Sequence, residues 1–281
     1  MVSTSLTPLV DDLLPLLRQF VQGDYGIALG GAHAKGVADP QSDLDFYLFA
    51  RHLLPEAERK RLCQESHLSL EPITGWGIHD PFVQAGTDFY LNGLKVECWF
   101  RNVDLVAGII EEAQAGIVKR ELVTWTVTGF YNHCALSDLA HMIPIDDPVG
   151  ILACWQAAVR HYPPALRDSI LRAHLPAAKF WRGNFHYHSA VRRGDVIYVM
   201  SIVHQVIHNL IQVIFALNET YFPGDKKLGA ALDRLDNKPA DFSVRIERLL
   251  LLRDGAPETL TRQQHDLEAL VSEVEALVDR V

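Results

Sequence analysis

The segment 29–46 restricts the fold of this chain more than any other. It consists of the end of an apolar run, two glycines and, after eleven intervening residues, a second apolar run that opens with alternating acids. The residues in question are Gly30, Gly31, Asp43 and Asp45. Alternate side chains of a strand point to the same face of a sheet, so Asp43 and Asp45 project together. We therefore expect two strands joined through a glycine turn, in a sheet that is apolar on the face opposite the acids.

This arrangement favours a metal site beside a phosphate site. Two carboxylates side by side repel each other, and each raises the pKa of the other unless a cation lies between them. Mg²⁺ is usually held by one or two carboxylates together with substrate phosphates. Glycines have no Cβ, so their backbone N–H groups can come close to a phosphate. We expect Asp43 and Asp45 to bind Mg²⁺ or Mn²⁺ and the glycine turn to hold phosphate.

A third acid, Glu97, fits the same site. Asn92-Gly93 separates the apolar runs 89–91 and 94–100 and predicts a tight hairpin. Glu97 alternates with Val96 and Cys98 on the returning strand, so it faces away from them. A neighbouring strand could align Glu97 with the Asp pair. Two metals roughly 3.5–4 Å apart would then stabilise both the attacking and the leaving oxygen of an in-line displacement.

These residues together resemble the signature of the polymerase-β-like nucleotidyltransferase superfamily. The resemblance implies that Gly30 and Gly31 hold a triphosphate, that Asp43 and Asp45 bind the metals, and that Glu97 completes the metal site or helps to deprotonate the acceptor hydroxyl. Members often place Ser directly after the glycines, with its hydroxyl on a phosphate. This chain has Ala32 at that nucleotide-binding position, where His33 or backbone amides are expected to substitute for the hydroxyl.

The segment 215–228 is similar to the helical domain of bacterial nucleotidyltransferases, which include the aminoglycoside and lincosamide adenylyltransferases. In those proteins a lysine of the helical domain can reach the triphosphate, which implies this role for Lys226. The resemblance as a whole implies transfer of a nucleoside monophosphate, AMP from ATP, to a hydroxyl of a small-molecule acceptor with release of pyrophosphate.

The fold class predicted from the sequence is α+β, with a mixed sheet and flanking helices followed by a helical bundle. The pattern changes near residues 143–148, and from Val149 onward it is almost wholly helical. We therefore expect a nucleotidyltransferase domain over 1–147 and a helical domain over 148–281. The expected strands are 25–29, 44–49, 89–91 and 94–100; the expected helices include 9–20, 54–67, 104–115 with Asp104 as N-cap, 196–217 and 259–281.

The charge balance argues against a nucleic-acid partner. The formal net charge is −9, and no basic stripe is present beyond the short 192–195 segment. Proteins that bind polynucleotides carry clustered Lys and Arg, because their affinity comes from displacing counterions. An acidic protein suits a small, cationic acceptor better. We expect a monomer or homodimer.

The apolar pattern argues against a membrane protein. The N-terminal segment is amphipathic, with Asp11, Asp12 and Arg18 interrupting its apolar run, and no uninterrupted apolar stretch is long enough to span a bilayer. We expect a cytoplasmic protein. Its four cysteines form no CxxC pair, which favours buried reduced thiols.

A polar stripe follows the apolar helix expected over 196–217. Its members are Ser201, His204, Gln205, His208 and Gln212. Three interpretations are open: polar groups that are hydrogen-bonded between buried helices, an acceptor- or base-binding surface, and a zinc site that uses the i, i+4 spacing of His204 and His208. The segment His186-Tyr-His188 is expected to be a solvated loop.

Two other functions compete with small-molecule transfer. One is transfer of AMP to a protein, as in toxin–antitoxin nucleotidyltransferases. The other is a catalytically silent nucleotide-binding or regulatory module, which Ala32 in place of Ser would favour.

Overall fold

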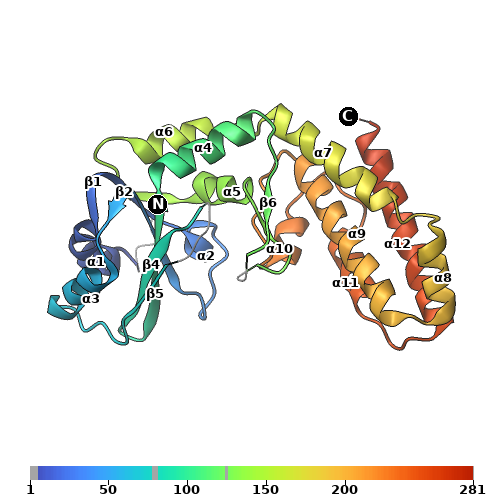
Figure 1. Cartoon of the computed structure of the whole chain (residues 1–281), viewed down its shortest axis with the longest axis horizontal. Helices are drawn as coiled ribbons and strands as arrows, with labels where there is room; N and C mark the ends of the chain where they lie inside the picture. The colour runs from blue at the N-terminus through green and yellow to red at the C-terminus, as the bar shows by residue number, and fades with distance from the viewer. Residues whose placement is uncertain (1–5, 78–81, 124–125, 281) are drawn as a thin grey trace. The chain divides into compact units, whose positions relative to one another are not determined.

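The computed structural model describes residues 6–77, 82–123 and 126–280 (Figure 1). The chain forms two compact units, one made of residues 1–112 and 135–161 and the other of residues 113–134 and 162–281. The first holds a mixed sheet flanked by helices, and the second consists mainly of helices. The predicted α+β class, with helices in the C-terminal half, is confirmed.

The first unit is built on six strands in the order β3-β4-β5-β2-β1-β8. The neighbours β2 and β5 are parallel, and the other neighbours are antiparallel. The bounds are Val21–Leu29 for β1, Leu44–Leu53 for β2, Thr74–Gly77 for β3, Ala85–Leu91 for β4, Leu94–Asn102 for β5 and Ile143–Asp146 for β8.

One face of this sheet is the apolar core of the unit. Leu44, Phe46 and Leu48 of β2 pack with Val96 and Cys98 of β5, and with the buried side of α1. This alternation follows from the pleat, which sends every second side chain of a strand to the same face. The helices of the unit are α1 Thr7–Gln19, α2 Gly31–Ala34, α3 Glu56–Glu65, α5 Cys134–His141 and α6 Ile151–Ala158, and α4 Val103–Gln114 runs from this unit into the next.

The predicted hairpin is confirmed, whereas the predicted N-cap is wrong. Asn92 and Gly93 join β4 to β5 with φ of 52° and 80°, as a tight two-residue turn requires. Helix α4 starts at Val103, and the side chain of Asn102 accepts from the amides of Asp104 at 2.9 Å and Leu105 at 3.3 Å. The cap is therefore Asn102, because its oxygen reaches the amides that the first turn leaves free.

The second unit is built around α9 Val196–Leu217, most of which is buried. Helices α7, α8, α11 and α12 contact it, and a short hairpin of β6 and β7 completes the unit. The bounds are Pro164–Lys179 for α7, Phe185–Arg193 for α8, Leu228–Asp233 for α10, Phe242–Leu250 for α11, Pro257–Val278 for α12, Arg120–Glu121 for β6 and Phe130–Tyr131 for β7.

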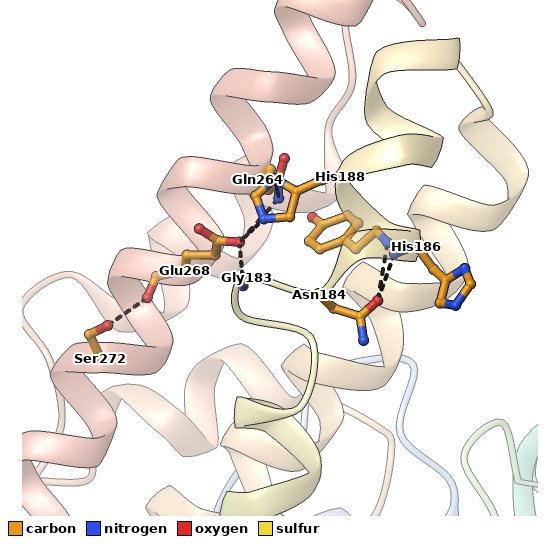
Figure 2. A network of polar contacts seen from close by, with 8 residues as sticks. Gly183, Asn184, His186, His188, Gln264, Glu268 and Ser272 are labelled. Atoms are coloured by element: carbon orange, nitrogen blue, oxygen red, sulfur yellow. Dashed lines mark hydrogen bonds and ion pairs between the residues drawn. The ribbon is translucent and has the colours of Figure 1, made fainter.

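The segment around His186 and His188 is helical, so the loop predicted there is wrong. Figure 2 shows that Asn184 caps α8, with its side chain accepting from the amides of His186 and Tyr187. The helix stops at Gly194, which has a left-handed conformation. Its partner α12 contributes Gln264, which bonds the Nδ1 of His188 at 2.9 Å. Asn184 and Gly194 are ordinary start and stop signals for a helix.

The ranges of the two units are not those of the domains predicted over 1–147 and 148–281, which stay a prediction. Residues 113–134 pack with the second unit. Helix α6 belongs to the first unit, where Trp155 packs edge-on against Phe49 of β2 at 5.2 Å between centroids. The segment 143–146, where the pattern changes, is the edge strand β8.

Two predictions from composition are modified. Cys63, Cys98 and Cys134 are buried and free, as expected, but Cys154 is exposed. Helix α9 has the length and composition of a membrane span, yet 72% of its most apolar window is buried inside the protein. A core helix satisfies the same criteria, and α9 occupies the core of its unit.

Candidate metal and phosphate site

Acidic side chains gather on the sheet face opposite the apolar core. The register places Asp45 of β2 opposite Glu97 of β5, and Glu97 opposite Asp88 of β4. Asp43 lies directly before β2. One ligand oxygen from each of Asp43, Asp45 and Glu97 lies within 4.8 Å of the others. The structure therefore brings together the three carboxylates that the sequence singled out, and their role in binding metal and in catalysis stays a prediction.

The Asp45 carboxyl is the most strongly perturbed acid of this group. Burial, followed by the charges of Asp43 and Glu97, raises its pKa to about 7, and Arg101 opposes the shift. Uncompensated negative charge is costly at a partly buried site. A divalent cation among these oxygens would remove that cost. The donor set, which consists of hard carboxylate oxygens, fits Mg²⁺ or Mn²⁺.

The glycine turn lies against Asp45 and Tyr47. A Cβ on Gly31, whose φ is +57°, would lie 1.7 Å from the Oδ2 of Asp45. A Cβ on Gly30 would lie 2.0 Å from the Tyr47 ring. Both positions require glycine because the turn touches the sheet face where the acids stand. The turn is thus adjacent to the carboxylates.

The amides of both glycines already donate within the protein. Gly30 donates to the backbone oxygen of Asp45 at 2.8 Å, and Gly31 donates to the Tyr47 hydroxyl at 3.0 Å. The amides of Ala32 and His33 fall in the first turn of α2, where a helix offers no internal acceptor. If phosphate binds at this turn, the absence of side chains on the two glycines lets the phosphate come close to the backbone. The amides of Ala32 and His33 would then donate hydrogen bonds to it.

A partly buried ionic group links the turn to the sheet. Asp138 of α5 accepts from Lys35 at 2.8 Å and from Arg101 at 3.1 Å. The Arg101 guanidinium lies 3.7 Å from the Tyr47 ring centroid and 3.9 Å from that of Phe82. Burial would raise the pKa of Asp138, but Lys35 and Arg101 outweigh it and lower that pKa. Lys35 closes α2, so its pairing with Asp138 fixes the position of the glycine turn.

Lys95 and Trp99 hold the carboxylate of Glu97, and the sequence reasoning missed both. The Lys95 ammonium forms an ion pair with Oε1 of Glu97, and the Trp99 indole donates to Oε2 at 3.2 Å. Every second residue of β5 points to the same face of the sheet. The alternation that predicted the direction of Glu97 therefore also places Lys95 and Trp99 on its face.

Asp88 is a fourth acid beside this group. It accepts from the Trp76 indole at 3.0 Å. Burial and the charge of Glu97 raise the pKa of Asp88, and the hydrogen bond from Trp76 opposes this shift. Its position opposite Glu97 follows from the hairpin register, which a two-residue Asn-Gly turn defines.

The residues predicted in the C-terminal half lie in the second unit. Lys226 is exposed in the turn before α10, which starts at Leu228. The neighbouring Asp225 accepts from the amides of Val127 and Thr128. The contact between Lys226 and a triphosphate stays a prediction.

The polar stripe divides along α9. His208 bonds the Tyr131 hydroxyl at 2.8 Å, and Gln212 bonds the Nε2 of His133 at 3.1 Å. These bonds join polar groups inside the unit, although the Nδ1 of His133 and the Nε2 of Gln212 have no partner among the described residues. The other half, Ser201, His204 and Gln205, is exposed. In the described part of the chain, the metal-capable group of carboxylate, imidazole and thiol ligands consists of Asp43, Asp45 and Glu97, with neither His204 nor His208 in it.

Comparisons with known proteins give little more. A family model described as a domain of unknown function, DUF4037, matches residues 136–228. No curated protein matches the chain. Among solved structures, a nucleotidyltransferase-like protein from Exiguobacterium sibiricum 255-15 is similar over 94% of this chain and 74% of its own, with 13% identity and a TM-score of 0.47. A similarity this distant says nothing about which residues act, or on what.

Proposed function

We propose that this protein is a metal-dependent nucleotidyltransferase that moves a nucleoside monophosphate, AMP from ATP, to a hydroxyl of a small molecule and releases pyrophosphate. The observation that carries the proposal is the group of Asp43, Asp45 and Glu97, whose oxygens lie within 4.8 Å of one another. The glycine turn supports it, because the turn packs against Asp45 and therefore lies next to these acids.

Asp43, Asp45 and Glu97 would hold Mg²⁺ or Mn²⁺. When bound, the metal would neutralise triphosphate charge and activate the acceptor oxygen. The carboxylates would fix the position of the metal, and the absence of a side chain on Gly31 lets α2 lie beside them. Asp138 pairs with Lys35 at the end of this turn and would help to hold a phosphate site beside the metal site.

A second candidate, the silent nucleotide-binding module, is favoured by one observation. The amides of Gly30 and Gly31 are engaged within the protein, and Ala32 offers no hydroxyl in place of the Ser that relatives often carry. Fewer donors would then remain for a triphosphate. Such a module would bind nucleotide without turnover.

The test combines binding and turnover. Isothermal titration with each of the four ribonucleoside triphosphates and Mg²⁺ identifies the donor, and pyrophosphate release across a panel of small alcohols measures transfer. The transferase proposal requires that a triphosphate binds, that turnover depends on metal, and that turnover is lost in Asp43→Asn. Binding without turnover on the whole panel would favour the silent module. No binding of any triphosphate would refute both proposals.

A further inference from the structure

One buried arginine contacts both ends of the glycine turn. At the start of α2, the amide of Gly31 donates to the Tyr47 hydroxyl at 3.0 Å. Just past the end of α2, the Lys35 ammonium bonds Asp138 at 2.8 Å. The guanidinium of Arg101 lies 3.7 Å from the Tyr47 ring centroid and donates to Asp138 at 3.1 Å. A single side chain of β5 therefore joins the two contacts that link the turn to the sheet.

Register and packing place Arg101 on the same sheet face as the acids. It pairs with Phe49, which follows Asp45 and Tyr47 at steps of two along β2, so these side chains share a face. The Phe82 ring centroid lies 3.9 Å from the guanidinium carbon, and 3% of Arg101 is exposed. A planar guanidinium stacks on aromatic rings, which a lysine ammonium cannot do. The contact with Tyr47 is therefore specific to arginine.

A second buried arginine, Arg59 of α3, is also 3% exposed but is bonded differently. Its Nε donates to the Thr87 hydroxyl at 2.8 Å and its Nη2 to the Gly86 carbonyl at 3.0 Å. Its Nη1 donates to the Leu54 carbonyl. In Arg101, Nε and Nη1 are buried and have no hydrogen-bond partner in the described part of the chain. Because a buried donor without an acceptor costs free energy, Arg59 has the contacts of a structural residue and Arg101 does not.

The turn and the Asp45 carboxylate are so close that a shift of one moves the other. The amide of Gly30 donates to the backbone oxygen of Asp45 at 2.8 Å. A Cβ on Gly31 would lie 1.7 Å from the Oδ2 of Asp45, so no space separates the turn from this carboxylate. A displacement of α2 would therefore displace a carboxylate of the candidate metal site. Arg101 contacts the residues that link both ends of α2 to the sheet, so its loss would reach Asp45 through the turn.

We propose that Arg101 is a positioning residue of the candidate site, which acts through Tyr47 and Asp138 to keep α2 against the Asp45 carboxylate. The first-turn amides of α2 are thereby kept beside the acids. The use of these amides by a nucleotide phosphate rests on the proposed function, whereas the dependence of the position of α2 on Arg101 does not.

The test compares Arg101→Lys with Arg59→Lys in the full-length protein. Both variants keep the positive charge and replace a buried guanidinium, so they differ in what the side chain contacts. Mg²⁺ alone is titrated, and hydrogen exchange of the Gly31 amide is followed by NMR, with the Leu48 amide of the central strand β2 as reference. Exchange at Gly31 reports on its contact with Tyr47, whereas global unfolding would affect both amides.

In Arg101→Lys, the Gly31 amide should exchange roughly ten-fold faster while Leu48 is unchanged, the effect of losing one hydrogen bond. Mg²⁺ affinity should fall by roughly ten-fold, as expected when a residue that orients a metal ligand is changed. Arg59→Lys should lower the stability to urea and leave Mg²⁺ affinity, and the exchange at Gly31 relative to Leu48, unchanged. Equal effects of the two variants on these two readouts, or wild-type values of both in Arg101→Lys, would overturn the proposal.

Tyr47→Phe tests the same link without changing Arg101. It keeps the ring and removes the hydroxyl that accepts from Gly31, so it should speed the exchange of Gly31 by a similar factor. With that contact gone, adding Arg101→Lys should change the Gly31 exchange by less than about two-fold, because the two residues act on one contact. Additive effects, or wild-type exchange in Tyr47→Phe, would show that Arg101 does not act through Tyr47 and would overturn the proposal.

The two proposals fail separately, because neither readout uses a nucleotide. Absence of triphosphate binding and of pyrophosphate release, with the effects on Gly31 intact, would refute the transferase and keep the role of Arg101. Metal-dependent turnover in the wild-type protein, with wild-type exchange and Mg²⁺ affinity in Arg101→Lys, would keep the transferase and refute the role of Arg101.

Discussion

The two units treat buried polar groups in opposite ways. In the first, the carboxylates of Asp43, Asp45 and Glu97 crowd together without enough positive charge to balance them. In the second, the histidines around α9 are neutral and paired, such as His208 with Tyr131 and His174 with Asn209. Charge held at a cost is typical of a functional site, and neutral hydrogen-bonded groups are typical of a core.

This contrast gives Asp45 and the buried histidines opposite responses to pH. The pKa of Asp45 is raised to about 7, so the folded protein keeps its proton where the unfolded chain has lost it, and stability falls as pH rises toward and through 7. The pKa values of His133 and His208 are lowered to about 4, chiefly by burial, so stability falls as pH drops from about 6.5 toward 4.

Removing the charge of Asp45 should have the largest effect. Asp45→Asn is expected to lower transfer at least about a thousand-fold, because a metal ligand is lost, and to raise apo stability at pH 8 by on the order of 2 kcal/mol. Pyrophosphate release and urea unfolding measure these effects. Asp104→Asn, in an exposed ion pair with Arg51, is the control and should change neither. Unchanged turnover in Asp45→Asn would contradict the proposed mechanism.

The buried histidines should make the second unit less stable in acid. We expect the amides of α9 to lose hydrogen-exchange protection as pH falls from about 6.5 to 4, by about 3 kcal/mol for one such histidine. His208→Gln should reduce this loss of protection. His204→Gln changes an exposed histidine of the same helix and should not. Equal pH dependence in the two variants would contradict the assignment.

Gly31 tests whether the turn and the acids form one site. Gly31→Ala places a Cβ 1.7 Å from Asp45 Oδ2, so the carboxylate must move, and Mg²⁺ affinity should fall by roughly thirty-fold, about 2 kcal/mol. Gly36→Ala is the control, because its φ is also positive, at +67°, but no atom lies within 4 Å of the added Cβ. Equal loss in both would assign the effect to backbone strain and not to contact with Asp45.

These positions show how far sequence reasoning reaches. Alternation placed Asp43 and Asp45 on one face, and Asn92-Gly93 defined the hairpin that carries Glu97. The pairing between distant segments could not be predicted. No local sequence pattern indicates that β2 lies parallel to β5 with Asp45 opposite Glu97. The anchor of Lys35 on Asp138 joins residues about a hundred positions apart for the same reason.

Competing signals in the local sequence explain the wrong N-cap of α4 and the missed strand β8. Asn102 and Asp104 are both good N-caps, and the cap is decided by where β5 ends. The edge strand β8 is four residues long and contains Pro144, which hides it among turn signals, although proline is tolerated at a sheet edge.

Lys226 offers a smaller test, from the second unit. Lys226→Ala should raise the KM for ATP by roughly ten-fold if its ammonium contacts the triphosphate, the effect of one charge-assisted contact. Lys226→Arg keeps the charge and should keep most of the affinity. His204→Ala and Gln205→Ala should instead alter the acceptor kinetics if the exposed half of the stripe binds acceptor. Wild-type constants in all of them would leave these residues as ordinary surface.

The smallest effect is expected at Lys95, and it tests whether the first unit balances its own charge. The Lys95 ammonium occupies one oxygen of Glu97, so a metal that uses this oxygen must displace it. The pair is partly exposed, with 40% of the Lys95 side chain accessible, so it contributes little to stability. Lys95→Met keeps the apolar stem, and Mg²⁺ affinity should rise by about three-fold as competition for Glu97 ends. Lys60→Met breaks the exposed pair with Glu56 and should leave Mg²⁺ binding unchanged. Weaker Mg²⁺ binding in Lys95→Met would mean that the lysine positions Glu97 for the metal, and the first unit would then hold its acids in place with a cation as well as with tryptophan.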